Sequence, residues 1–251
     1  MSAEERTRVR ADQLLVERGL AESRSRAQAL LLAGRVFSGE RRIDKCGERL
    51  LVNSPLEVRE GARFVSRGGD KLEGALRDLK FDVSGRIAAD FGASTGGFTD
   101  CLLVYGAVRV HAIDVGYGQL ADKLRKDPRV VSLERTNARH LTREALGELV
   151  DLVVVDASFI GVEKLLPGVT AVLRPGGHLL ALVKPQFEAG RSEVTRGKGV
   201  IRDEQVRLSA IARARESIER AGFAIEAEAD SAVPGPKGNL ERFVLARRND
   251  A

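Results

Sequence analysis

The chain has 251 residues, with 41 Lys and Arg against 36 Asp and Glu and a formal net charge of +5. This length accommodates one large domain or a small domain beside a medium one, and the basic balance weakly favours a polyanionic partner. No apolar run approaches the ~20 residues of a membrane-spanning helix, no signal-peptide pattern begins the chain, and Cys46 and Cys101 are not in metal spacing, so we expect a cytoplasmic protein without a metal.

The first region of the chain predicts short helices and turns. Residues 12–19, DQLLVERG, carry apolar side chains at helical spacing and end on a glycine, which predicts one short helix. Ser23 is a good N-cap for a second helix, which Gly34 ends. The segment RVFSGERRI, residues 35–43, then predicts a strand, a turn and another strand.

Basic side chains cluster in this region, which holds 13 basic and 10 acidic residues through Val65. Charge alone fits a solvated helix face as well as a nucleic-acid surface. The pattern D..L...GL..SR..A..L...GRV, within residues 8–60, resembles the small RNA-binding module of ribosomal protein S-four, also called the alpha-L motif. The resemblance implies an RNA-binding domain at residues 1–62 whose arginines lie against phosphates. The candidates are Arg24, Arg26, Arg35, Arg41 and Arg42.

After a seam at residues 63–69, taken as a linker, strands and helices alternate. Near-continuous apolar runs predict strands buried on both faces of a parallel sheet. These runs lie at residues 86–92, 108–115, 130–134, 150–157 and 177–185. Residues 223–231 and 242–248 alternate more and predict an antiparallel edge pair. We therefore expect residues 70–251 to form an α/β, Rossmann-like sheet of seven mostly parallel strands.

The first of these strands runs into a glycine-rich bend, ADFGASTGGFTDCL, residues 89–102. Ligands of open α/β sheets bind beyond the carboxyl ends of the strands, and Asp114 ends the next strand, where an acid can bond ribose hydroxyls. A dinucleotide loop favours glycine at the position of Ser94, which argues against NAD. S-adenosylmethionine has no pyrophosphate, and its carboxylate can use the NH groups of a helix start. A tight turn without a ligand stays open at this point.

A longer run, DFGASTGGFTDCLL…AIDVGYGQL…LERTNAR, resembles the TlyA family, also named hemolysin A. The similarity extends from the N-terminal module to about residue 247. It implies an S-adenosylmethionine-dependent 2'-O-methyltransferase of ribosomal RNA, with an FtsJ-like catalytic domain and a cytidine in one or both ribosomal subunits as its target. The resemblance also implies six cofactor-binding residues: Asp90, Gly92, Ser94, Gly96, Asp114 and Asn137.

Four scattered charged residues complete the resemblance. Singly, a lysine at a strand end commonly reaches solvent, and an aspartate there commonly caps the next helix. Their order and their flanks, SRGGDKL, DASFI, VKPQFE and GNLERF, match the Lys-Asp-Lys-Glu tetrad of FtsJ-like ribose methyltransferases. The match implies that Lys71, Asp156, Lys184 and Glu241 converge in space as the catalytic residues. Lys184 is expected to accept the hydroxyl proton, and Lys71 to hold the ribose or offset charge on its oxygen. The alternative, that no group acts as a strong base and the proton leaves late, stays open at this point.

The polar segment EAGRSEVTRGKGVIRD, residues 188–203, is expected to flank the site and to bind phosphate through Arg196 and Lys198. Three rival functions remain. A membrane-active hemolysin lacks a long apolar or strongly amphipathic segment, and a non-catalytic RNA-binding ribosome assembly factor has no use for the complete tetrad. An NAD-dependent oxidoreductase is disfavoured by Ser94 and by the basic N-terminal module.

Overall fold

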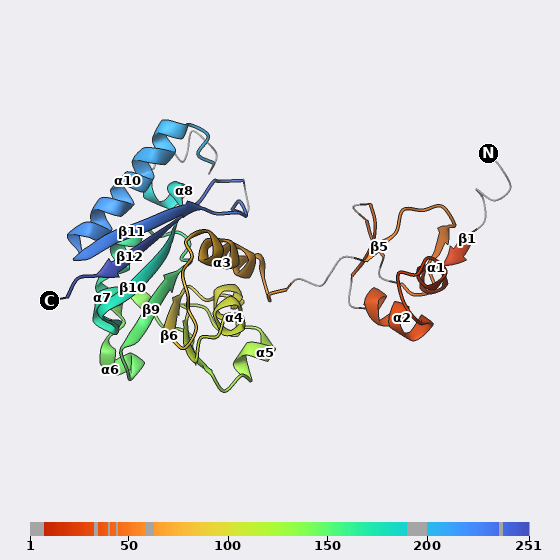
Figure 1. Cartoon of the computed structure of the whole chain (residues 1–251), viewed down its shortest axis with the longest axis horizontal. Coiled ribbons are helices and arrows are strands. Elements are labelled where there is room, and N and C mark those ends of the chain that lie inside the picture. The colour runs from red at the N-terminus through yellow and green to blue at the C-terminus, as the bar shows by residue number, and fades with distance from the viewer. Residues whose placement is uncertain are drawn as a thin grey trace. The chain divides into compact units, whose positions relative to one another are not determined.

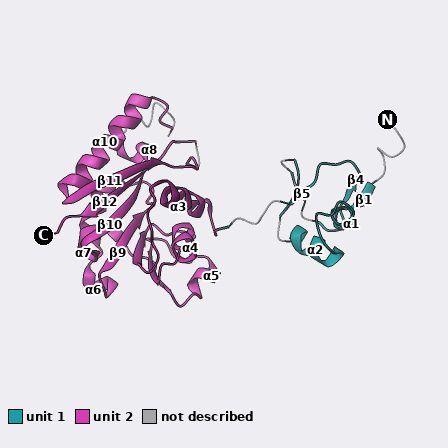
Figure 2. Ribbon diagram, viewed as in Figure 1, with its two compact units in different colours: residues 1–63 teal, residues 64–251 magenta. Residues whose placement is uncertain are grey.

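The computed structural model describes residues 8–32, 35–39, 41–43, 45–58, 63–189, 200–235 and 238–250. Contacts divide the chain into two compact units, Met1–Arg63 and Phe64–Ala251, which Figure 2 shows in different colours. The division falls inside the expected linker at residues 63–69. The side chain of Phe64 is buried in the core of the second unit, and helix α3 (Arg67–Asp78) begins before the expected linker ends.

The described residues of the first unit form two packed helices and five short strands. Helix α1 (Ala11–Glu17) contacts helix α2 (Arg24–Leu32), whose start is capped by Ser23 because its Oγ accepts from the Arg26 amide at 3.2 Å. The strands form two small antiparallel sheets: β1 (Arg8–Arg10) with β4 (Arg49–Leu51), and β2 (Val36–Ser38) with β3 (Arg41–Arg42) and β5 (Glu57–Val58). One apolar cluster joins these elements; it includes Leu14, Leu15, Ala27, Leu31, Val36 and Ile43.

The second unit contains a seven-stranded sheet in the order β11-β12-β10-β9-β6-β7-β8. Its strands are β6 (Ile87–Phe91), β7 (Arg109–Ile113), β8 (Val130–Leu133), β9 (Val150–Val155), β10 (Leu173–Val183), β11 (Phe223–Asp230) and β12 (Arg242–Arg248). The pairs among β10, β9, β6, β7 and β8 are parallel, whereas β12 is antiparallel to both β10 and β11. The predicted mostly parallel sheet with an antiparallel edge is confirmed.

Helices cover both faces of this sheet (Figure 1). One side carries α3, α4 (Gly97–Val104) and α5 (Asp122–Arg125); the other carries α6 (Arg143–Leu146), α7 (Leu166–Val172) and α10 (Glu204–Arg220). Successive strand residues turn to opposite faces, so Leu152 and Val154 join the cluster under α3 and α4, while Val153 and Val155 join the cluster under α7 and α10. This two-sided burial explains the continuous apolar runs in the sequence.

The order of the strands places the site. Strand β6 lies between β7 and β9. The connection that follows β6 and the connection that follows β9 pass to opposite faces of the sheet, which leaves a crevice between them at the carboxyl edge. Because β12 runs opposite to β10, the start of β12 lies at this same edge, and Val183 pairs there with Arg242. Lys184 follows β10 and Glu241 precedes β12, so reversal of one strand brings these two residues to one edge.

Candidate active site

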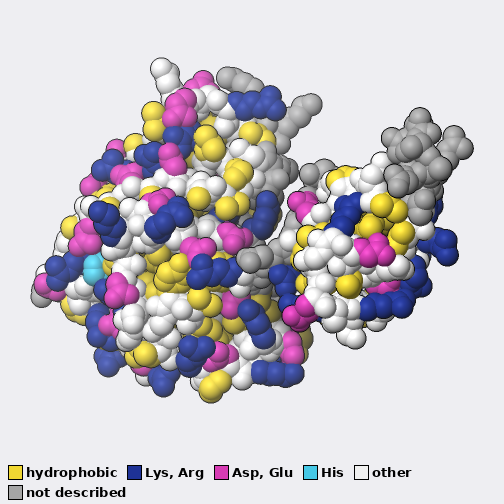
Figure 3. Space-filling model, turned by 45° about the vertical axis from the view of Figure 1, so that its right-hand side comes forward, with side chains coloured by type: hydrophobic (Ala, Val, Ile, Leu, Met, Phe, Trp, Pro, Cys, Tyr) yellow, Lys and Arg dark blue, Asp and Glu magenta, His cyan; other side chains and the backbone are white. Residues whose placement is uncertain are grey.

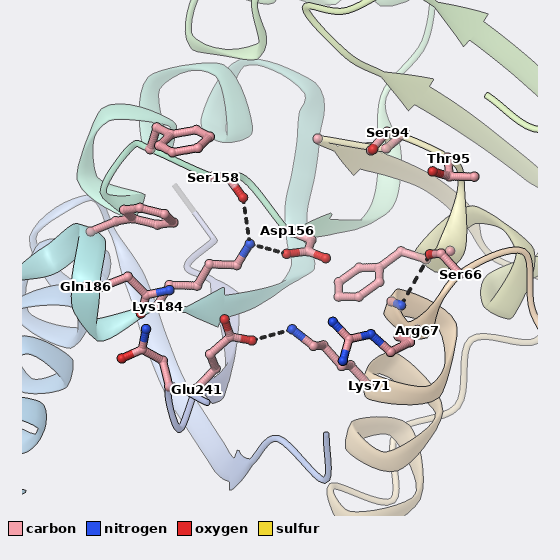
Figure 4. Close-up of a pocket in the computed structure, with 18 residues that line it drawn as sticks. Ser66, Arg67, Lys71, Ser94, Thr95, Asp156, Ser158, Lys184, Gln186 and Glu241 are labelled. Carbon is pink, nitrogen blue, oxygen red and sulfur yellow. Dashed lines mark hydrogen bonds and ion pairs between the residues drawn. The ribbon is translucent and has the colours of Figure 1, made fainter. Parts of the chain in front are cut away.

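A pocket of about 730 Å³ opens at the carboxyl edge of the sheet, and Figure 4 shows its lining residues. Its walls come from the glycine bend after β6, the residues that follow β9 and β10, the first turns of α3 and α4, and the segment before β12. The volume lies within the range of about 300–1,000 Å³ that is typical of small-molecule sites.

The four charged residues of the expected tetrad all line this pocket and form two ion pairs (Figure 4). Lys71 Nζ lies 2.5 Å from Glu241 Oε2, across 170 positions of sequence. Lys184 Nζ lies 2.5 Å from Asp156 Oδ1. The structure therefore places two amines and two carboxylates in one cavity.

Three of these four side chains are almost completely buried. Lys71 and Lys184 are each 7% exposed and Glu241 is 1% exposed. Removing such groups from water has a large desolvation penalty, which only a close opposite charge offsets. Each lysine has a carboxylate within 2.5 Å, so the two positive and two negative charges compensate one another. The removal of any one charge leaves its partner buried and uncompensated.

At two positions of the glycine bend, the backbone has a conformation that only glycine adopts without strain. Gly92 has φ +89° and Gly96 has φ +97°. A Cβ on Gly92 would lie 3.0 Å from the Asp156 carbonyl oxygen, and one on Gly96 would lie 2.3 Å from Leu124 Cδ1. The bend is thus packed tightly against the end of β9 on one side and against α5 on the other.

Asp114 fixes the shape of this bend from the end of β7. Its Oδ2 accepts a hydrogen bond from the Ser94 amide at 2.8 Å, and its Oδ1 accepts one from the Gly116 amide at 2.7 Å. Ser94 lines the main pocket and, together with Asp114, a small adjoining cavity. A nucleoside bound across both cavities would therefore lie beside a carboxylate that already has a fixed orientation.

The six expected cofactor residues do not all line the pocket. Gly92 and Ser94 line the main pocket, whereas Asp90 and Gly96 lie behind its wall. Asp90 is completely buried, and its Oδ2 accepts from both the amide and the hydroxyl of Thr99, at 2.9 and 2.7 Å. Burial, with a smaller contribution from the charge of Asp156, raises the pKa of Asp90 to about 7, against the lowering effect of the hydrogen bonds from Thr99. Its role in the structure is to support the start of α4.

Asn137 lies on neither pocket wall. Its side chain is exposed and accepts a hydrogen bond from the Arg139 amide at 3.1 Å, which caps a short 3₁₀ helix, η2 (Ala138–His140). Twelve further lining residues were not among the expected site residues: Ser66, Arg67, Gly68, Ala93, Thr95, Gly97, Phe98, Ser158, Phe159, Gln186, Phe187 and Asn239. Most of them lie within three positions of an expected residue, which is the one signal in the sequence that could have found them.

The expected RNA-contacting arginines of the first unit are largely exposed, and Figure 3 shows basic side chains on its visible face. Arg26 is exposed on α2, and Arg35 is partly buried at the start of β2. Arg41 Nη1 lies 2.7 Å from Glu48 Oε1, and Arg42 occupies β3. Arg24 donates to the buried carboxylate of Asp12 at 3.0 Å. Arg196 and Lys198 lie outside the described residues.

The described residues contain neither a helix that could cross a membrane nor a cluster of side chains that could hold a metal ion. No helix in this part of the chain is long and apolar enough to cross a membrane. The described residues also contain no group of three or more His, Cys, Asp or Glu side chains arranged to hold a metal ion.

Comparison with known proteins gives matches along almost the whole chain. Residues 64–249 match the FtsJ-like methyltransferase family, and residues 9–54 match the S4 domain. The chain is 47% identical to the 16S/23S rRNA (cytidine-2'-O)-methyltransferase TlyA of Mycobacterium tuberculosis, over 96% of this chain and 90% of that protein. It is 40% identical to hemolysin A of Brachyspira hyodysenteriae, over 93% of this chain and 97% of that protein.

A solved structure shows the same relationship. A Streptococcus thermophilus protein named as a hemolysin superposes with a TM-score of 0.75 at 38% identity, covering 97% of this chain and 90% of that chain. The family resemblance inferred from the glycine bend, the tetrad flanks and the N-terminal pattern is confirmed by these matches.

Proposed function

The chain belongs to the FtsJ-like methyltransferase family, and from this premise we propose that it transfers a methyl group from S-adenosylmethionine to the 2'-hydroxyl of a cytidine in ribosomal RNA. The observation that carries the proposal is the pairing of Lys71 with Glu241 and of Lys184 with Asp156 in one pocket. The substrate class is supported by the S4 domain at residues 9–54 and by the 47% identity to a cytidine-2'-O-methyltransferase of ribosomal RNA.

The described residues fit S-adenosylmethionine. Gly97 and Phe98, the first two residues of α4, line the pocket, so their amides are placed to bind the cofactor's carboxylate, while the Thr99 amide donates to Asp90. The carboxylate of Asp114 borders the adjoining small cavity, where it can bond ribose hydroxyls. When bound, this cofactor supplies an electrophilic methyl group.

The tetrad performs the remaining chemistry. A ribose hydroxyl is a weak nucleophile, so it has to lose its proton as it reacts, and Lys184 Nζ would accept that proton once the ammonium group has released one of its own to water. Asp156 holds that nitrogen in place from 2.5 Å. Lys71, held by Glu241, offsets the negative charge that develops on the ribose oxygen. Fixed geometry of this kind can supply about 7–11 kcal/mol of the barrier, and a positioned base about 10²–10⁴-fold in rate.

The first unit and the segment around Arg196 and Lys198 supply RNA affinity in this proposal. Arginine contacts to phosphates fix the register of the RNA without reading its sequence. Binding should therefore weaken steeply as the salt concentration rises. We place the protein in the cytoplasm, where its ribosomal RNA substrate lies.

Ribose methylation mapped on ribosomal RNA tests the proposal. Purified ribosomal subunits are incubated with S-adenosylmethionine and either the wild-type chain or Lys184→Ala. We expect a new 2'-O-methylcytidine with the wild type only, and unchanged S-adenosylmethionine affinity by calorimetry in the variant. RNA binding by a wild type that binds no S-adenosylmethionine would instead favour an assembly factor. Leakage of liposomes on addition of the pure protein would favour the membrane activity that the name of its Brachyspira relative suggests.

A further inference from the structure

The segment that follows β9 holds a second polar side chain against the amine of Lys184. Lys184 Nζ donates a hydrogen bond to Ser158 Oγ at 3.2 Å, in addition to its ion pair with Asp156 Oδ1 at 2.5 Å (Figure 4). Ser158 lines the pocket and is itself exposed, whereas Lys184 is only 7% exposed. The family tetrad explains Asp156 and Lys184, but it assigns nothing to Ser158.

The geometry of an amine nitrogen gives this contact a consequence. A neutral amine has one bond to carbon, two N–H bonds and one lone pair, arranged as a tetrahedron. Only the lone pair can accept a proton, so its direction decides whether transfer occurs. The hydrogen bond to Ser158 Oγ fixes the direction of one N–H bond of Lys184, and Asp156 Oδ1, its ionic partner, occupies a second side of the nitrogen at 2.5 Å. With these two sides of the nitrogen taken, the lone pair of the deprotonated amine faces the remaining direction.

The segment that carries Ser158 is tied at two points to the residues that follow Lys184. The Phe159 ring contacts the Phe187 ring with centroids 5.3 Å apart. The Val162 amide donates to Glu188 Oε1 at 2.8 Å, which ties the segment to helix α8 (Pro185–Glu188). Since α8 follows Lys184 directly, donor and acceptor are fixed to each other.

We propose that Ser158 is a positioning residue of the methyl transfer, which holds one N–H bond of Lys184 so that the amine's lone pair faces the ribose hydroxyl. The inference rests on the proposed function. In the reaction the ribose oxygen forms its bond to the methyl carbon and the bond from sulfur to that carbon breaks. The hydroxyl proton moves to the lone pair of Lys184 and is released to water after product leaves.

Steady-state kinetics of two substitutions at this position test the inference. Ser158→Ala removes the acceptor, so the amine can turn about its bond to Cε and its lone pair is misdirected part of the time. We expect kcat to fall about 3- to 10-fold, the size of one lost hydrogen bond, with KM for ribosomal RNA and for S-adenosylmethionine within twofold of wild type. Ser158→Thr keeps the hydroxyl on an exposed position, and should restore at least half of the wild-type kcat.

Ser84→Ala serves as the matched control, because Ser84 is exposed and lies outside both described cavities. Equal melting temperatures and S-adenosylmethionine affinities across the variants exclude a folding defect. A wild-type kcat in Ser158→Ala overturns the inference, as does a Thr variant as slow as the Ala variant or a loss confined to KM. An inactive wild-type protein overturns the proposed function, and the role of Ser158 with it. If the wild type is active, the kcat of Ser158→Ala tests the role of Ser158 alone.

Discussion

Glu241→Gln isolates the energetics of the buried charges, because it replaces a carboxylate with a neutral group of the same shape. Glu241 is 1% exposed and its Oε2 lies 2.5 Å from Nζ of Lys71, which is 7% exposed. The substitution leaves the ammonium group of Lys71 buried without its counter-ion. Breaking a buried pair in this way costs about 3–5 kcal/mol of folding free energy. Urea denaturation at pH 7, followed by circular dichroism, measures this loss.

A double-mutant cycle makes the expectation specific. Lys71→Met removes the amine but keeps a long flexible side chain, and by itself should also destabilise the second unit because it leaves the carboxylate buried. The combination of Lys71→Met with Glu241→Gln removes both charges, so its loss should be at least about 2 kcal/mol smaller than the sum of the single losses. Additive losses would refute the account of the site as mutually compensating buried pairs.

Three further predictions concern other buried groups. Burial raises the pKa of Asp90 from about 4 in the unfolded chain to about 7 in the folded chain, so the wild type loses stability as pH rises through this range. Asn does not titrate, so the stability of Asp90→Asn relative to wild type should rise over the same range, by up to about 1.4 kcal/mol per pH unit. A stability difference that stays constant with pH in urea denaturation contradicts this. The buried carboxylate of Asp12 accepts hydrogen bonds from Arg24 and from other donors, so Asp12→Asn should lower stability by about 1–3 kcal/mol. It should also weaken binding to ribosomal RNA in a filter-binding assay, although it makes the net charge more positive. Stronger binding would show that Asp12 only neutralises charge. Gly96→Ala should lower the melting temperature and the S-adenosylmethionine affinity more than Gly85→Ala, since both have positive φ but only the first Cβ meets another side chain; equal effects in calorimetry would contradict the packing argument.

The fold of the second unit followed closely from the sequence. Apolar runs such as residues 150–157 predicted strands buried on two faces, and the observed β9 covers residues 150–155. Residues 223–231 and 242–248 were predicted as an antiparallel edge pair; β12 has the predicted bounds and pairs with β11, which is the edge strand, while β12 lies inside the sheet and is buried on both faces from Phe243 to Ala246. The apolar runs predicted strands correctly because the period of apolar side chains depends on which faces of a strand are covered, which is a local property of the sequence.

The cofactor residues show where local reasoning stopped. Asp90 and Gly92 are two positions apart in the same bend, yet only Gly92 lines the pocket, while Asp90 turns inward to Thr99. Which of them faces a ligand depends on the direction of each residue relative to the sheet and to α4. Ser158 likewise follows the expected Asp156 by two positions, and no pattern distinguishes it from an ordinary loop serine.

The sequence by itself determined the strands, the two-part organisation of the chain and the order of the four charged residues, because spacing and residue type encode local burial and family motifs. Only the tertiary structure decided that Lys71 pairs with Glu241 and Lys184 with Asp156. The Lys184–Asp156 pair depends on the parallel pairing of β10 with β9, after which these two residues follow. The Lys71–Glu241 pair depends on β12, which inserts antiparallel beside β10 and returns its first residues to the edge where the parallel strands end. Strand order arises from packing between segments far apart in the chain, and no local pattern records it.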